Sequence, residues 1–546
     1  MLILNNIIMN QFYKYILAIF VSISFVSCVN DLDVEPVDPN IVTTDQVYAK
    51  QENYKGVLAK CYAALSLSGQ QGPAGDPDIS NFDEGYSSFV RLSFYIQELT
   101  TDEAIMGSQT NGLRQLATHT WDANTAILNG YYARLYQIIG YSNEFLRQTT
   151  EAKLQSRNHT DPTFKSEVEN FRAEARFLRA YAYWVLLDTY GKVPFVTDAD
   201  EMNPQLLPEQ IQPADLFNYV EKELLEIEKI LPSTNEYGRV DKVAANFLLS
   251  RLYLNAKVYT KTEQWQKAAE YAVKVINSHY KLSPKYLYNF LADNHTSPEI
   301  IWSLNADGVQ AKSYGSSTFF VMAQTGGTML TYLNMGIAGG WGNIRVRPEF
   351  VDKFNVEDQN FDPADPNAFK KGDSRALFFN VNHKKEIAAL PGTFQDGYAF
   401  TKWRNVDKNG NGGSDKAYVD TDFPLFRLSE AYLTAAEAYV RMGKSSEALE
   451  YINVVRNRAY NNGDGAISIA DLDLDFILDE RSRELSWELT RRTDLIRYDK
   501  FTTNNYLWSW KGYDKNGIAV DPKYNIFPLP SADVTANPKL VQNTGY

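Results

Sequence analysis

Two glutamates near the C-terminal end of the chain have the spacing of a catalytic acid–base pair. Glu480 and Glu484 lie four residues apart in the segment DERSRELSWELTRRTDLIRYDKF (479–501). On a helix their carboxylates would lie on one face, about 6 Å apart, as a general acid and base require. The same segment also holds Arg481, Arg483, Arg491, Arg492 and Asp494. Each acid has an arginine three residues away, which would keep it ionised, so we expect a salt-bridge lattice between helices rather than a catalytic pair.

Other patterns in the chain only partly match metal or catalytic motifs. The segment DKNGNGGSDKAY (407–418) begins like a calcium-binding EF-hand loop, but its twelfth position is Tyr418 instead of the glutamate that binds the ion. The histidines show no zinc spacing, and no G-x-S-x-G, H-E-x-x-H or P-loop sequence occurs. We therefore expect no cofactor and no metal. A glycoside hydrolase stays open, because its two carboxylates need no fixed spacing.

The sequence is rich in aromatic residues, with 35 Tyr, 29 Phe and 9 Trp. Two of them occur beside glycines in segments without helical periodicity: Tyr314 in SYGSSTFFV and Trp341 in GGWGN. The apolar face of a sugar ring packs on an aromatic plane, while its hydroxyls need polar partners at the edge. Core packing is the alternative for both rings. Glycines on both sides of Trp341 favour an exposed loop tip.

The charge balance argues against a nucleic-acid partner. The formal net charge is −13 and the pI about 5.1, and no basic block occurs. With 44% hydrophobic residues, the chain is long enough to bury a large core.

The N-terminal segment predicts export and a lipid anchor. An apolar run from Tyr15 to Ser27 follows Lys14 and stops at Cys28. The run suits the hydrophobic part of a secretory signal and is too short to span a bilayer as a helix. Ser27 before the cysteine resembles the lipobox of bacterial lipoproteins, although Phe25 stands where that motif usually has leucine. We predict a signal peptide over residues 1–27 and lipidation of Cys28, with a plain signal peptide as the alternative.

Helical periodicity dominates the parts of the chain that must position these residues. Apolar residues recur at helical spacing in 171–191 and in 214–231, which end at Gly191 and before Pro232. Segments 242–259 and 265–278 form one expected helix pair, and 428–443 and 446–460 form a second. Their alternation of alanines and aromatic residues resembles tetratricopeptide (TPR) repeats, although the two pairs do not follow one another in a tandem array.

Between the two pairs, from about residue 297 to 422, helical periodicity fails and Gly, Asn, Asp and aromatic residues are frequent. Long loops of this kind in a compact domain are usually functional. We therefore predict a predominantly α-helical protein, in which TPR-like helix pairs carry a loop-rich binding face with a few short strands. Residues 28–546 are expected to form a single domain.

Three segments carry a specific family resemblance. They are EARFLRAYAYWVLLDTYGKVPFVT (174–197), the charged segment 479–501, and the C-terminal YNIFPLPSADVTANPKLVQNTGY (524–546). In this order, behind a lipoprotein signal, they resemble the SusD (RagB/SusD) family of Bacteroidetes outer-membrane glycan-binding lipoproteins. The pattern is most similar to that of the starch-binding member that names the family.

The resemblance implies a set of ligand-binding residues. Tyr314 and Trp341 match two aromatic residues on which the starch-binding member holds its ligand. Its polar contacts match Arg91 in SSFVRLSF, Asp83 in FDEG and Asn111 in TDEAIMGSQTN. The aromatic set is incomplete, because Ser108 and Met106 stand where the starch binder has tryptophans.

The resemblance also implies a role without catalysis. Proteins of this family are held at the cell surface by their N-terminal lipid and pass oligosaccharides to a TonB-dependent transporter of the SusC type in the outer membrane. The expected ligand is an oligosaccharide or polysaccharide, most simply a starch-like α-glucan. A surface glycoside hydrolase and a TPR-like scaffold that binds only protein are the alternatives.

Overall fold

The computed structural model describes residues 42–69, 77–80, 82–83, 85–108, 110–200, 203, 207–354, 372–390, 392–460 and 465–546. The predicted signal peptide (1–27) and the predicted lipidation site Cys28 lie outside these residues. The chain divides into a unit of residues 1–54 and a unit of residues 55–546. In the first unit, helix α2 (Thr44–Tyr48) begins at a capping box in which Thr43 and Gln46 bond each other's backbone N–H groups.

Helix accounts for 49% of the structure and strand for 7%, which confirms the predominantly α prediction. Among the described residues, none of the helices has both the length and the apolar character needed to cross a bilayer. The helices that frame the larger unit are α3 (Asn53–Ser66), α4 (Phe89–Gln97), α5 (Leu113–Thr118), α6 (Ala126–Gln148), α7 (Glu151–Ser156), α8 (Pro162–Tyr190), α9 (Pro213–Ile227), α10 (Lys242–Leu254), α11 (Ala256–Thr260), α12 (Trp265–Ile276), α16 (Leu428–Arg441), α17 (Ser445–Ala459), α18 (Leu474–Leu485), α19 (Arg491–Arg497) and α20 (Ser531–Ala536).

Helix α8 shows how local sequence sets the ends of an element. The Asp161 side chain accepts a hydrogen bond from the backbone N–H of Phe164, and Pro162 occupies the first turn, where it costs no hydrogen bond. The helix ends at Gly191, whose φ of +70° favours glycine. The predicted helix 171–191 is therefore the C-terminal two thirds of a longer one. Helix α8 packs between α6 and α9.

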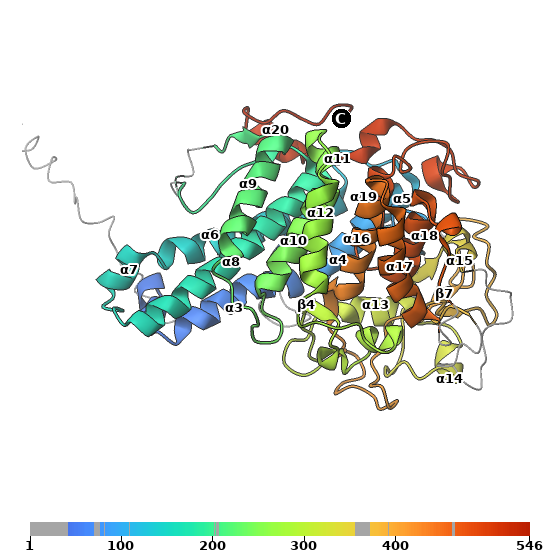
Figure 1. The fold of residues 1–546 in the computed structure, drawn as a ribbon, viewed down its shortest axis with the longest axis horizontal. Helices are drawn as coiled ribbons and strands as arrows, with labels where there is room; N and C mark the ends of the chain where they lie inside the picture. The colour runs from blue at the N-terminus through green and yellow to red at the C-terminus, as the bar shows by residue number, and fades with distance from the viewer. Residues whose placement is uncertain are drawn as a thin grey trace, which may run out of the picture. The chain divides into compact units, whose positions relative to one another are not determined.

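Both predicted helix pairs form, as α10 with α12 and as α16 with α17. Helix α12 also packs against α16, so the two pairs lie side by side although about 150 residues separate them (Figure 1). The pairs are thus continuous in space and interrupted only in the sequence. Small residues make this possible: Ala268, Ala269 and Ala272 on α12 are fully buried and allow close approach of the backbones.

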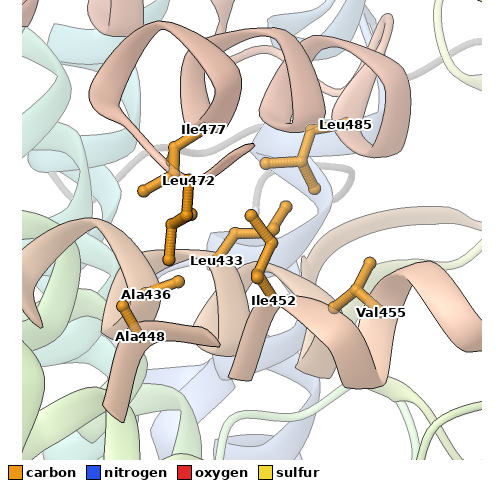
Figure 2. Packing of buried hydrophobic residues seen from close by; sticks show 8 residues of the cluster. All are labelled: Leu433, Ala436, Ala448, Ile452, Val455, Leu472, Ile477 and Leu485. Carbon is orange, nitrogen blue, oxygen red and sulfur yellow. The ribbon is translucent and has the colours of Figure 1, made fainter. Parts of the chain in front are cut away.

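The second pair continues into α18 through a compact apolar cluster (Figure 2). Helices α16 and α17 and the segment from Leu472 to Leu485 converge on it. Its buried members are Leu433, Ala436, Ala448, Ile452, Val455, Leu472, Ile477 and Leu485. Burial of this size stabilises by about 1.5–3 kcal/mol for each large side chain, and it fixes α18, which carries Glu480 and Glu484.

Short antiparallel sheets tie the loop-rich region to the helices. Strand β4 (Ile300–Leu304) pairs with β8 (Phe423–Arg427), and Leu304 lies opposite Phe423. The loop-rich region therefore starts and ends at this strand pair and covers residues 305–422. These limits are close to the predicted ones of 297 and 422. The other pairs are β1 (Ala104–Met106) with β5 (Ile344–Val346), β2 (Val193–Pro194) with β3 (Gln210–Ile211), and β6 (Phe378–Phe379) with β7 (Ala399–Phe400).

The loop-rich region is less irregular than its sequence suggests. It contains α13 (Ser317–Gln324), α14 (Met329–Tyr332) and α15 (Pro348–Asp352), none of which the sequence analysis predicted. Helix α13 is buried along its whole length, so it has no polar face and shows no amphipathic period in the sequence. It is the element that positions the candidate site.

Candidate functional site

The predicted acid–base pair is part of a buried ionic lattice. Glu480 and Glu484 are 0% exposed. Glu480 pairs with Arg375 at 2.8 Å, with Arg456 at 2.7 Å and with Arg483 at 2.8 Å. Glu484 pairs with Arg427 at 3.0 Å, with Arg375 at 3.1 Å and with Arg458. No substrate could reach carboxylates in this setting, and the lattice interpretation is confirmed.

Most arginines of this lattice come from distant segments rather than from the helix that carries the two acids. Arg483, at i+3, does pair with Glu480, but Arg481 pairs with Asp494 at 2.7 Å instead of with Glu484. Burial alone would raise the pKa of Glu484; Arg458, Arg427 and Arg375 outweigh burial and lower it to about 2. Tertiary contacts, rather than neighbours on the same helix, therefore keep this acid ionised.

Helix α13 holds the two predicted aromatic residues together. Tyr314 lies three residues before its first turn. At its other end, the N–H groups of Trp341, Gly342 and Asn343 donate to the carbonyls of Met322, Thr325 and Ala323 at 2.7 Å each. These carbonyls belong to the end of the helix, where intrahelical donors are missing. One helix thus fixes the loops of both rings.

The Trp341 and Tyr314 rings form an angled pair at the surface. Their centroids are 6.2 Å apart with an interplanar angle of 55°. Trp341 is 41% exposed and Tyr314 is half-buried. Beneath them Phe319, on α13, lies 6.4 Å from the Trp341 ring centroid and is fully buried. The predicted loop-tip exposure of Trp341 is confirmed.

A third ring, that of Tyr418, extends this pair. Its centroid lies 4.9 Å from that of Tyr314 at an angle of 42°, and its hydroxyl donates to the Tyr314 hydroxyl oxygen at 2.8 Å. In the sequence, Tyr418 stands out only as the residue at the position where a calcium loop has its glutamate. A tyrosine in a polar loop gives no periodic signal, so only the fold could reveal it. We call Trp341, Tyr314 and Tyr418 the aromatic face.

Arg91, on α4, supports the aromatic face from inside. Its guanidinium carbon lies 3.7 Å from the Tyr86 ring centroid, 4.6 Å from that of Phe319 and 5.8 Å from that of Trp341. Its Nε donates to the Tyr95 hydroxyl at 2.7 Å, and the residue is only 6% exposed. Such cation–π contacts are worth about 0.5–2 kcal/mol each. Arg91 thus has a structural role, because it positions the rings. Its contact with the ligand stays a prediction.

Glycine allows the Tyr314 loop to approach α4. A Cβ on Gly85, whose φ is +71°, would lie 2.6 Å from Cβ of Tyr314. A Cβ on Gly315 would lie 2.3 Å from Oγ of Ser88, the side chain that caps α4 and donates to the Gly315 carbonyl at 2.7 Å. Neither position can carry a side chain without moving the face.

The remaining predicted residues lie in segments beside the face. Asp83 is exposed, two residues before Gly85. Asn111 lies in the 3₁₀ turn Thr110–Gly112, and its side chain is outside the described part of the structure. The Ser108 N–H donates to Oδ1 of Asn343 at 3.1 Å, so the Ser108 segment borders the Trp341 loop. Met106 is 4% exposed within β1 and is a core residue, so its side chain is not part of the exposed surface.

The calcium-like segment 407–418 begins with a self-contained polar turn. Both carboxylate oxygens of Asp407 accept hydrogen bonds inside it: Oδ1 from the N–H groups of Asn409 and Asn411, and Oδ2 from the Asn411 side chain, all at 2.8 Å. Among the described residues, no group of three His, Cys, Asp or Glu side chains could hold a metal ion.

A row of aromatic rings at the surface of a helical scaffold is typical of proteins that bind ligands with an apolar face. Comparison with known proteins identifies its family: the chain belongs to the SusD family. The SusD family model matches residues 379–546, and a model described as "Starch-binding associating with outer membrane" matches residues 81–254. The predicted family is confirmed.

Among its relatives, the chain is 38% identical to the starch-binding protein SusD of Bacteroides thetaiotaomicron, over 98% of each chain. It is 24% identical to the SusD-like protein P38 of Formosa agariphila, over 95% of this chain and 96% of the relative. The first of these relatives is named as a starch-binding protein. The SusD family consists of non-catalytic carbohydrate-binding proteins, so the chain is not an enzyme, as predicted.

Solved structures have the same fold. A SusD superfamily protein of Bacteroides thetaiotaomicron superposes with a TM-score of 0.68 at 20% identity, over 90% of this chain and 99% of that one. A surface glycan-binding protein A of the same organism, solved in complex with laminarihexaose, gives a TM-score of 0.67 at 20% identity with the same coverage.

Proposed function

We propose that this protein captures oligosaccharides or polysaccharides at the cell surface on the aromatic face formed by Trp341, Tyr314 and Tyr418. The observation that carries the proposal is the angled pair of rings 6.2 Å apart, one of them 41% exposed, which a buried helix holds in place. Successive sugar rings of a curved chain present their apolar faces at an angle to one another, which suits tilted aromatic planes. Asp83 and Asn111 would bond hydroxyls of the ligand, and Arg91 would support the rings and donate to a hydroxyl.

The proposed ligand is a neutral, starch-like α-glucan. The 38% identity to a starch-binding protein supports this choice, and Tyr418 supplies a ring for a set that lacks aromatic residues at Ser108 and Met106. A related fold has been solved with laminarihexaose, so a β-linked glucan is the ligand to test beside it.

The proposed role is delivery rather than turnover. The protein would be held in the outer membrane through lipidated Cys28 and would pass its ligand to a SusC-like TonB-dependent transporter. The family description that names association with the outer membrane supports this location. A glycoside hydrolase is disfavoured, since Glu480 and Glu484 are sealed in the ionic lattice.

Titration calorimetry tests the ligand. We expect wild-type protein to bind maltoheptaose and α-cyclodextrin in preference to laminarihexaose, and Trp341→Ala to weaken binding about tenfold or more, since a stacking ring in a binding site is worth about 1–3 kcal/mol. Unchanged affinity in the variant would reject the aromatic face. Preference for laminarihexaose would keep the face and reject the α-glucan, and a protein that binds none of these sugars would favour the TPR-like protein-binding scaffold.

Membrane fractionation tests the anchor. Cys28→Ala is expected to leave the protein folded and to release it from the membrane fraction of cells that lack the transporter. A variant that remains in that fraction would contradict lipid anchoring through Cys28.

A further inference from the structure

A cavity of about 300 Å³ lies in the loop-rich region, and none of the three rings of the aromatic face lines it. Its residues come from the segments 285–291 and 404–410, with additions from Asn334, Ser374 and Leu377. This volume is at the lower end of the range for small-molecule sites, about 300–1,000 Å³, and suits one or two sugar rings.

The walls and floor combine apolar surface with a buried cation. Leu291, Leu377 and Val406 are at most 6% exposed and give the cavity apolar walls. Arg404, at 2% exposed, also lines it and donates from Nε to the Thr401 carbonyl at 2.9 Å. Burial lowers the pKa of Arg404 to about 10, and the group stays charged at neutral pH.

The rim adds two more cations. Lys285 and Lys408 are exposed, and Nζ of Lys285 lies 5.5 Å from the ring centroid of Tyr288, which also lines the cavity. The one acid among the described lining residues is Asp407, whose oxygens its own turn already uses. Asp293 lies 3.7 Å from Nζ of Lys408 and offsets part of that charge.

Cations therefore outnumber carboxylates here even when Asp293 is counted, in a protein whose net charge is −13. A locally positive cavity in an acidic protein concentrates and orients anions. A neutral sugar could accept hydrogen bonds from these cations, but a carboxylate would add the attraction between opposite charges and could accept charge-assisted bonds from more than one of them.

We propose that this cavity is a second ligand site, separate from the aromatic face, and that it takes a sugar ring carrying a carboxylate, that is, a uronic acid unit. The apolar walls and Tyr288 receive the ring, and the exposed Lys285 and Lys408 receive the carboxylate. The buried Arg404, whose Nε and Nη2 donate to Thr401, adds positive charge beneath them. The choice of a sugar rests on the proposed function; the choice of an acidic one rests on the cavity.

The test uses two probes that differ only at C6: methyl α-D-glucuronide, with a carboxylate, and methyl α-D-glucoside, with a hydroxymethyl group. Titrations followed by NMR on the whole protein are expected to show saturable glucuronide binding, at least about fivefold tighter than glucoside binding and weaker in high salt. The double variant Lys285→Gln/Lys408→Gln is expected to weaken glucuronide binding about tenfold. Both lysines are exposed, so the variant should fold normally.

Two controls separate this site from the aromatic face. Lys281→Gln changes an exposed lysine four residues from Lys285 that does not line the cavity, and it should leave glucuronide binding unchanged. Trp341→Ala should also leave glucuronide binding unchanged while it weakens maltoheptaose binding.

Four results would overturn the proposal: no saturable glucuronide binding, equal affinity for both probes, glucuronide affinity that survives the double variant, or glucuronide affinity that is lost in Trp341→Ala. Each can be distinguished from failure of the aromatic face, because maltoheptaose binding by wild type and by the Trp341 variant is measured in the same series.

Discussion

The ionic lattice around Glu484 and the aromatic face around Trp341 are both made of residues whose types suggest chemistry. They differ in access. Glu484 is 0% exposed, and three arginines surround it. Trp341 is 41% exposed and has one side open to solvent. Charged side chains with complete sets of partners thus hold a fold together, whereas a large apolar ring left at the surface is available for a ligand.

The largest expected effect is on the lattice. Glu484→Gln removes a charge that Arg375, Arg427 and Arg458 share, which leaves buried cations short of a partner. We expect about 3–5 kcal/mol of destabilisation in denaturant unfolding, with maltoheptaose affinity retained in the folded fraction. A variant as stable as wild type would show that the lattice contributes little.

The same variant should alter the response to acid. The pKa of Glu484 is lowered to about 2 in the fold, so its ionisation stabilises the native state above the ordinary glutamate pKa, and this stability is lost as the pH falls from about 4.5 towards 2. Unfolding midpoints measured across this pH range should fall less steeply in Glu484→Gln than in wild type. Parallel curves for the two proteins would contradict the assigned pKa.

A backbone change in the scaffold should come next. Ala269→Pro removes a hydrogen bond inside α12 and forces the proline ring against the preceding turn, where the residue is 1% exposed and α12 packs on both α10 and α16. We expect a loss of about 3 kcal/mol or more. Ala269→Ser is the matched control that keeps the N–H group. A midpoint that barely moves in the proline variant would mean that α12 is misassigned.

One buried and one exposed tryptophan allow a direct test of the difference between core and surface rings. Trp302→Ala, at a ring 1% exposed, is expected to cost about 3–5 kcal/mol of stability. Trp341→Ala should cost less than about 1 kcal/mol, because its ring is already partly hydrated, while it weakens maltoheptaose binding. Thermal melts and titrations of both variants check this. A large drop in the melting temperature of Trp341→Ala would show that the Trp341 ring is part of the hydrophobic core.

The smallest effect should follow from Tyr418→Phe, which keeps the ring and removes only the hydroxyl that donates to Tyr314. We expect maltoheptaose affinity to fall at most about threefold, the size of one neutral hydrogen bond at a solvated site, whereas Tyr418→Ala should lose more. Equal affinities for Tyr418→Ala and wild type would remove Tyr418 from the face.

Most of the scaffold can be predicted from the sequence alone. Periodic apolar residues and the stop at Gly191 predict α8, and the alanine-rich pairs predict α10 with α12 and α16 with α17, because these signals are local and recur at helical spacing. The ionic lattice of segment 479–501 and the exposure of Trp341 could also be predicted, because neighbouring charges and glycines along the chain indicate them.

How these parts meet cannot be predicted from local sequence and follows from the folded chain. Helix α13 gives no amphipathic signal because it is buried on every side, yet it fixes Tyr314 and Trp341. Arg375, Arg427 and Arg458 reach Glu484 from distant segments, and Tyr418 meets Tyr314 across a separation of 104 residues. Contacts of this kind depend on the packing of the whole chain, which local spacing does not record.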